Sequence, residues 1–350
     1  MTNRLQESDV RFKKILIISL GQLGDVILSL PALAAVREKF KSSQLTALVG
    51  KPAVGIVEIS QFADEIIFLD RRQLKTAPKL RSILELFRFA RGLRRQKFDL
   101  VVDLHSFYET NLLAFLSGAP SRIFANRDRR SLDLLSRFPS RPPLEDRTRH
   151  QADRYLSVLE PLGIKNADRI VKLKPRPSDV AEFDRWISET GADTKTRVGL
   201  FLGAGHPTRR WDIANFAQLA ERLSKLEDLQ VYVFLGPEER SLRPEVSALV
   251  SKNAVITEEL SLTSFFGAIA RLDVFVCGDT GPAHLAALAG VPMVLLAEKH
   301  VPTIFYPLTH KLKVLARATV NEITVNEVYS AVLTSTKHGA ENKDQPKQNK

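Results

Sequence analysis

The chain has 350 residues, enough for two domains, and 44% of them are hydrophobic, which is ordinary for a globular protein with packed cores. Its one cysteine, Cys277, excludes an internal disulfide framework and a zinc site built on several thiolates. The formal net charge of +11 favours polyanionic partners such as phosphorylated substrates, an acidic membrane surface or nucleic acid.

The positions of the basic and apolar residues indicate which of these polyanionic partners to expect. Basic residues gather in segments 71–97 and 122–130 without a helix-turn-helix or RNP pattern, so we expect an anionic inner-membrane surface and no nucleic acid. The alternative is that each cluster is an ordinary solvated face. No apolar run reaches the ~18 residues of a membrane span, and Gly21 and its neighbours break the first run too early for a secretion signal. We therefore expect a cytoplasmic protein, attached peripherally to the inner membrane.

The first half of the chain alternates short apolar runs with helix-like segments, after an N-terminal extension over 1–12. This alternation predicts βαβ units around a parallel sheet. The basic, proline-containing stretch 122–150 is predicted to be an irregular loop region. The expected strands are 14–18, 45–49, 65–69 and 98–104, and the expected helices include 25–40 and 153–162.

The same alternation restarts after a polar linker. We therefore predict two Rossmann-like domains, 13–165 and 166–325, with ligand bound in the cleft between the carboxyl ends of their strands. A last helix over 326–335 is expected to pack on the first domain, and the polar tail 336–350 is expected to be disordered. The strands expected in the second half are 197–202, 230–235, 254–256, 273–277 and 292–296, and the helices are 212–227, 238–250, 262–271 and 282–289.

The first candidate site follows the first strand, where Gly21 and Gly24 let the backbone turn sharply and approach a ligand closely. The spacing is not that of the G-x-G-x-x-G fingerprint, and no acidic residue ends the second strand, which argues against an NAD enzyme. Asp25 stands at the loop-to-helix junction. It is either a functional carboxylate at the mouth of the cleft or an N-cap of the following helix.

A second candidate loop contains Gly203, Gly205, Arg209 and Arg210. Small residues followed by two guanidinium groups and a helix start make a plausible phosphate clamp. The alternative is a surface loop anchored by Trp211.

The third candidate lies between a predicted strand and a helix that Pro282 suits at its start. The amides of that first turn, around Gly281, would face an anion, while Asp279 or Thr280 could cap the helix or bind a sugar. His284 could contact the ligand, although a histidine on an apolar helix is more often a core residue.

A weaker fourth candidate is Glu238, whose carboxylate could accept both hydroxyls of a ribose or simply belong to an acidic first helical turn. The sequence has no Asp-x-Asp pair, no HExxH motif and no histidine–carboxylate cluster at metal spacing. It also lacks a Walker A lysine loop and a G-x-S-x-G elbow. Neither a metal nor a cofactor is therefore expected.

Taken in order, these motifs resemble glycosyltransferase family 9, the heptosyltransferases of lipopolysaccharide core assembly. The resemblance runs from about Lys14 to about Ser335. The segments that carry it are KILIISLGQLGDVILSLPALAAVREKF, GAGHPTRRWDIANFAQLAERL and CGDTGPAHLAALAGVPMVLL.

This resemblance implies an α/β protein of GT-B architecture that transfers heptose with inversion, without a metal. The implied donor is ADP-L-glycero-D-manno-heptose and the implied acceptor is a lipopolysaccharide core or related lipid-linked saccharide. Asp25 matches the family's proposed general base, and Arg209 falls where many members carry a phosphate-binding lysine. Residues 279–281 match the donor-binding DTG motif, and Glu238 matches a ribose-binding glutamate.

Two features depart from the family pattern. Arg209 keeps the charge of the usual lysine but changes the hydrogen-bond geometry. Residues 297–300 are Ala-Glu-Lys-His, where the family often has Phe-Gly-Pro near the nucleotide. The alternatives are a transferase of the same fold with another nucleotide sugar, and a catalytically silent nucleotide- or saccharide-binding protein, which the presence of Asp25 disfavours.

Overall fold

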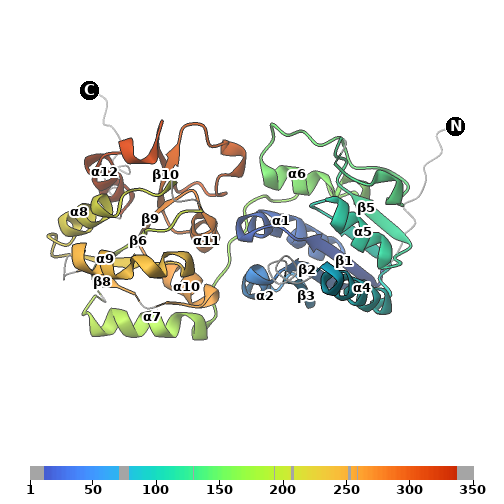
Figure 1. Ribbon diagram of the computed structural model, residues 1–350, viewed down its shortest axis with the longest axis horizontal. Helices are drawn as coiled ribbons and strands as arrows, with labels where there is room; N and C mark the ends of the chain where they lie inside the picture. Colours follow the sequence, from blue (N-terminus) through green and yellow to red (C-terminus); the bar gives the residue numbers. More distant parts are fainter. Residues whose placement is uncertain are drawn as a thin grey trace, which may run out of the picture. The chain divides into compact units, whose positions relative to one another are not determined.

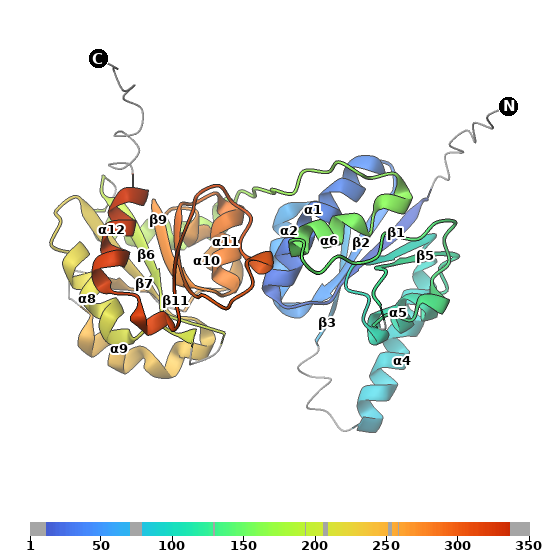
Figure 2. The same cartoon turned by 90° about the horizontal axis from the view of Figure 1, so that it is seen from above.

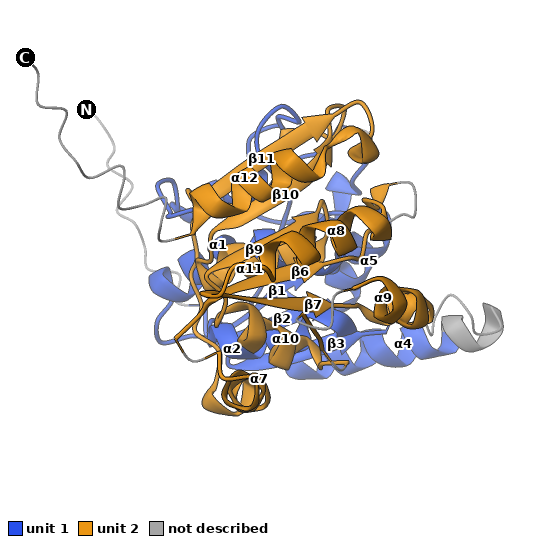
Figure 3. Ribbon diagram, turned by 90° about the vertical axis from the view of Figure 1, so that its left-hand side faces the viewer, with its two compact units in different colours: residues 1–169 blue, residues 170–350 orange. Residues whose placement is uncertain are grey.

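The chain divides into two compact units, Met1–Arg169 and Ile170–Lys350 (Figure 3). The computed structural model describes residues 12–70, 79–128, 130–192, 194–205, 209–250, 254–257 and 259–336. Most of the expected N-terminal extension and nearly all of the polar tail lie outside the described residues. No helix in the described ranges is long and apolar enough to cross a membrane.

Unit 1 contains a five-stranded sheet in the order β3-β2-β1-β4-β5, and all its strand pairs are parallel (Figure 1). Successive strands run outward from β1 in one direction to β3, and the chain then returns to the other side of β1 for β4 and β5. The order therefore reverses between β1 and β4. The strands are β1 (Lys14–Ser19), β2 (Gln44–Gly50), β3 (Glu65–Leu69), β4 (Leu100–Asp103) and β5 (Ser121–Phe124).

Alternate residues of a strand point to opposite faces of the sheet, and β1 and β2 are buried along nearly their whole length. Both faces of the unit 1 sheet are therefore covered. Leu16 and Ile18 of β1 share a buried cluster with Ala90 and Leu93 of α4 and with Leu113 of α5, so these two helices lie on the same face. The helical elements are α1 (Leu23–Lys39), η1 (Lys51–Ala53), α2 (Val54–Ser60), α4 (Lys79–Gln96), α5 (Tyr108–Leu116), η2 (Asp133–Leu135), α6 (Gln151–Ser157) and η3 (Glu160–Leu162).

Unit 2 contains a six-stranded parallel sheet in the order β11-β10-β9-β6-β7-β8. Counted from β6, this is the strand order of a dinucleotide-binding Rossmann sheet, and it reverses between β6 and β9. The strands are β6 (Thr196–Phe201), β7 (Leu229–Phe234), β8 (Val255–Ile256), β9 (Val274–Gly278), β10 (Met293–Glu298) and β11 (Leu312–Arg317).

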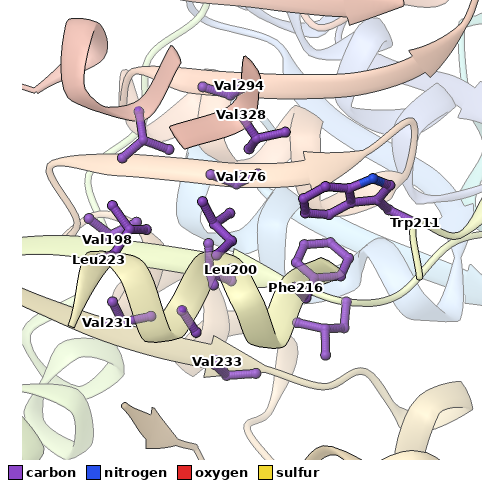
Figure 4. Packing of buried hydrophobic residues seen from close by; sticks show 14 of the residues in the cluster. Val198, Leu200, Trp211, Phe216, Leu223, Val231, Val233, Val276, Val294 and Val328 are labelled. Atoms are coloured by element: carbon purple, nitrogen blue, oxygen red, sulfur yellow. The ribbon is translucent and has the colours of Figure 1, made fainter. Parts of the chain in front are cut away.

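The core of unit 2 joins the sheet to α8 and α12. Figure 4 shows Phe216 of α8 beside Trp211, over Leu200 and Val233 of the sheet. The indole nitrogen of Trp211 donates to the carbonyl of Ile323 at 2.9 Å, which ties the loop before α8 to the segment before α12. The helical elements are α7 (Pro177–Glu189), α8 (Ile213–Leu223), η5 (Pro237–Leu242), α9 (Arg243–Leu249), α10 (Leu262–Ile269), α11 (Gly281–Ala289), η6 (Thr303–Phe305), η7 (Val320–Glu322) and α12 (Val325–Ser335).

The structure differs from the sequence-based expectations at the edges of both sheets and in one helix. It adds the edge strands β5 and β11, and β5 occupies the start of a stretch expected to be irregular. The expected helix 238–250 is divided between η5 and α9. Within unit 2, α12 contacts α8 and the sheet, whereas its expected packing on the first domain stays a prediction.

Candidate functional site

The candidate motifs lie where each sheet reverses its strand order. In unit 1, Gly21 follows β1 and His105 follows β4. In unit 2, Gly203 follows β6 and Asp279 follows β9. Ligands of open α/β sheets bind outside the carboxyl ends of the strands at this switch point, so the topology places all four loops where a ligand is expected.

The loop after β1 is packed tightly around Gly21. A Cβ atom on this residue would lie 2.5 Å from Nε2 of His105 and 2.8 Å from Oδ2 of Asp25, so only glycine fits here. The same Oδ2 atom accepts a hydrogen bond from the backbone amide of Gln22 at 3.0 Å. Asp25 is thus the third residue of α1, and Gln22 is the N-cap of that helix, so the alternative that Asp25 is itself the N-cap is wrong.

His105, which the sequence motifs did not include, is buried beside Asp25. Its Nε2 atom shares a 3.1 Å hydrogen bond with the hydroxyl of Tyr155 on α6. Its ring is flanked by those of Tyr155 and Phe107, at centroid distances of 5.3 and 5.5 Å. Burial, together with the negative charge of Asp25, raises the pKa of Tyr155, so the phenol keeps its proton next to the carboxylate.

Asp103, the last residue of β4, stabilises the turn that carries His105. The Asp103 carboxylate accepts hydrogen bonds from the amide of Ser106 and the side chain of Asn111, both at 2.8 Å. Ser106 has a φ of 48°, an uncommon conformation for a residue with a side chain. These bonds hold that conformation in place, and His105 with it.

A buried cluster of charged residues lies near Tyr155. Arg127 and Arg154 both bind the carboxylate of Glu145, at 2.9 and 2.5 Å, and all three side chains are largely shielded from solvent. The guanidinium of Arg127 also lies over the ring of Phe107, 5.4 Å from its centroid. Unit 1 therefore presents a buried, hydrogen-bonded polar site in which Asp25 lies beside His105.

Asp103 gives this site a testable pH dependence. Burial is the largest influence and raises its pKa from 3.8 to about 6. Between these two values, the Asp103 carboxyl keeps its proton in the folded protein and loses it in the unfolded chain. The resulting contribution to stability is complete below about pH 3.8 and is lost as the pH rises through about 6, an effect on the order of 3 kcal/mol.

We therefore expect Asp103→Asn, which mimics the protonated carboxyl, to gain stability relative to wild type as the pH rises from about 4 to 7. Urea unfolding of both proteins across this range measures the difference, and titrations elsewhere cancel in the comparison. A difference that stays constant with pH would contradict the raised pKa.

In unit 2, the loops after β6 and β7 enclose a carboxylate. A Cβ atom on either Gly203 or Gly236 would lie 2.6 Å from Oε2 of Glu239, so both glycines make room for this side chain. Glu239 is buried, which raises its pKa, while the charge of Arg210 opposes that shift. By contrast, Glu238, the residue singled out in the sequence, is exposed on η5.

Arg209 stands beside the carboxyl end of β9. Its charge lowers the pKa of Asp279, although burial raises that pKa by more. Its Nε atom lies 3.9 Å from Glu298, whose carboxylate also lies 3.2 Å from the imidazole of His300. Residues of the segment that departs from the family pattern thus lie next to the predicted phosphate-binding arginine.

The third motif forms the start of α11 as expected. Thr280 is the N-cap in an extended conformation, and Gly281 and Pro282 begin the first turn. His284 is buried within the helix, as a core histidine would be. Gly205 is exposed in the loop after β6 and Gly24 lies in the first turn of α1, while residues 206–208 are outside the described part of the chain.

Comparisons with known proteins agree with this arrangement. The family model for glycosyltransferase family 9 (heptosyltransferase) matches residues 86–331. Lipopolysaccharide heptosyltransferase 1 of Pseudomonas aeruginosa is 27% identical to this chain over 289 residues, which cover 81% of this chain and 78% of the relative.

Two solved structures resemble more than nine tenths of the chain. The glycosyl transferase family 9 protein of Veillonella parvula has a TM-score of 0.80, with 26% identity, and the match covers 92% of this chain and 97% of that one. The Escherichia coli ADP-heptose lipopolysaccharide heptosyltransferase II has a TM-score of 0.75, with 19% identity, over 94% and 99% of the two chains. The expected GT-B fold is thereby confirmed, and the chain is a glycosyltransferase that belongs to family 9, the heptosyltransferase family.

Proposed function

We propose that this protein transfers heptose from ADP-L-glycero-D-manno-heptose to a lipopolysaccharide core or related lipid-linked saccharide, with inversion at the anomeric carbon. Two of the three proteins named above, those of Pseudomonas aeruginosa and Escherichia coli, are lipopolysaccharide heptosyltransferases, and the second carries ADP-heptose in its name. The observation that carries the donor side is that Arg209 and the start of α11 meet at the switch point of the unit 2 sheet. A guanidinium and the amides of a helix N-terminus together suit a diphosphate.

In the proposed reaction, a hydroxyl of the acceptor attacks the anomeric carbon as the bond from that carbon to the diphosphate oxygen breaks. Asp25 takes the proton of the attacking hydroxyl. Arg209 and the amides around Thr280 and Gly281 stabilise the negative charge that develops on the departing ADP. No metal is part of this proposal, so chelation with EDTA should leave the rate unchanged.

The experiment that tests the proposal is a transfer assay with purified protein, ADP-heptose and lipopolysaccharide core acceptors. Release of ADP together with an acceptor heavier by one heptose supports it, and NMR of the product gives the anomeric configuration. A panel of other nucleotide sugars tests the alternative donor, which Glu298 and His300 beside Arg209 keep open. Donor binding without transfer to any acceptor would favour the silent binding protein.

On the donor ribose, we propose that Glu239 is a better candidate than Glu238. Its carboxylate faces the loops after β6 and β7, and hydrogen bonds from the amides of Ala204 and Gly236 leave further lone pairs on it. These lone pairs could accept the two ribose hydroxyls, a role that the exposed position of Glu238 does not favour.

We therefore expect Glu239→Gln to weaken ADP binding by roughly tenfold or more, as for loss of a charged hydrogen bond. Glu238→Gln is the matched control and should change the affinity by less than about twofold. Isothermal titration calorimetry with ADP measures both. The opposite ranking would restore Glu238 as the ribose-binding residue.

We also propose that the protein works in the cytoplasm, attached peripherally to the anionic inner-membrane surface. The net charge of +11 supports this, and a lipid-linked acceptor would be presented at such a surface.

A further inference from the structure

Large hydrophobic side chains are exposed mainly on unit 1 in the described part of the chain. Of the thirteen large hydrophobic side chains that are exposed in the described part of the chain, ten belong to unit 1. Several of them gather on α4 and α5, which contact each other and lie next to each other in Figure 2. Exposed apolar patches of this kind mark interaction sites with proteins or membranes.

On α5, three apolar side chains point away from the core. Tyr108, Leu112 and Phe115 are 53%, 47% and 44% exposed, and their spacing of four and three residues places them on one face of the helix. Leu113 and Ala114 occupy the opposite face and are buried against the sheet. The exposed stripe is therefore the outer face of the helix.

The outer face of α4 combines apolar and basic side chains. Leu84 and Phe87 are 50% and 66% exposed, and the exposed Arg88, Arg91 and Arg95 follow on the same face. Ala90 and Leu93 are buried on the face that meets the sheet. Along its length, α4 has five arginines and one lysine against a single glutamate.

We propose that the outer faces of α4 and α5 form a docking surface for an anionic lipid bilayer. Phe87, Leu112 and their apolar neighbours would enter the interface between headgroups and acyl chains, while the arginines of α4 bind lipid phosphates. A second copy of this chain is a poorer occupant, because its arginines would meet those of the first. This inference locates the proposed peripheral attachment on one surface and is independent of the transfer chemistry.

Vesicle binding tests the surface directly. The full-length protein is mixed with vesicles of phosphatidylcholine alone, or with one third phosphatidylglycerol, and pelleted at low and high salt. We expect binding to the anionic vesicles that weakens as salt rises, because exposed charge contacts are screened. Binding that is equal on both vesicles, or absent from both, overturns the proposal.

Two sets of variants assign the binding to this surface. The apolar pair Phe87→Ser with Leu112→Ser should weaken binding roughly twentyfold, and its control is Leu249→Ser on an exposed leucine of unit 2. Replacing Arg88, Arg91 and Arg95 by Gln should weaken it roughly fivefold per arginine. The control with the same loss of charge replaces Arg185, Lys225 and Lys313 of unit 2, which are also exposed.

The outcomes distinguish this docking surface from a docking surface elsewhere on the protein and from a surface for self-association. If the unit 1 variants bind anionic vesicles as tightly as wild type, the docking surface is elsewhere, even though attachment itself stands. If sedimentation shows a dimer that Phe87→Ser disrupts, and the wild-type protein does not bind vesicles, the surface serves self-association instead. Melting curves of every variant show that a loss of binding is not a loss of folding. Turnover of a soluble acceptor fragment should remain at the wild-type rate, which keeps this test separate from that of the transferase.

Discussion

Replacing Asp25 by asparagine is expected to lower the rate of sugar transfer by roughly 10²–10⁴-fold, the usual value of a general base. Donor affinity and thermal stability should stay close to wild type. The reason is that the amide oxygen of asparagine can still accept the hydrogen bond from the Gln22 amide, whereas it cannot take a proton from the acceptor. Initial rates at saturating donor and acceptor, measured beside a melting curve and ADP calorimetry, give the three quantities.

The competing interpretation gives Asp25 only a structural role at the start of α1. In that case Asp25→Asn keeps nearly full turnover, while Asp25→Ala loses about 1 kcal/mol of stability because the capping bond is gone. Asp179→Asn is the matched control, since Asp179 is the third residue of α7 and its carboxylate accepts a hydrogen bond from the amide of the N-cap Arg176, and it should not affect turnover beyond small changes. An active Asn variant would remove Asp25 from the mechanism and favour the silent binding protein.

The sequence predicted the central strands better than those at the edges. ILII and VFVC are continuous apolar runs because both faces of a central parallel strand are buried. The edge strand β11 has neither a continuous apolar run nor a regular alternation of buried and exposed residues, and Lys313 is exposed on it. In β5, Arg122 is buried only because its guanidinium bonds to the carbonyls of Leu135 and Ala119, which no local pattern indicates.

The candidate site was only partly visible in the sequence. Glycine loops after apolar runs identified the turns, because close packing around Gly21 and Gly203 requires residues without a Cβ. His105 and Tyr155 went unrecognised because they lie 80 and 130 positions beyond Asp25 and meet it only through the strand order and the packing of α6. The choice between Glu238 and Glu239 depends on the phase of a short 3-10 helix, which sequence patterns do not fix.

Replacing Arg209 by alanine is expected to weaken ADP binding by roughly 1.5–3 kcal/mol, which corresponds to about tenfold to 150-fold in Kd. The proposal gives this guanidinium the diphosphate as its partner, and its 3.9 Å separation from Glu298 is too long for a strong competing hydrogen bond. The side chain is about half exposed, so an incoming phosphate can reach it without unfolding the loop. Isothermal titration calorimetry with ADP measures the loss.

Two companion variants make this result specific to Arg209. Arg209→Lys should retain much of the affinity, since an ammonium keeps the charge, although it cannot bind two phosphate oxygens through a planar fork. Arg240→Ala removes another exposed arginine of unit 2, which pairs with Glu259, and should leave ADP affinity unchanged. If Arg209→Ala binds ADP as wild type does, the loop after β6 is no phosphate clamp. The diphosphate would then depend on the start of α11, and substitutions of Thr280 would become the decisive measurement.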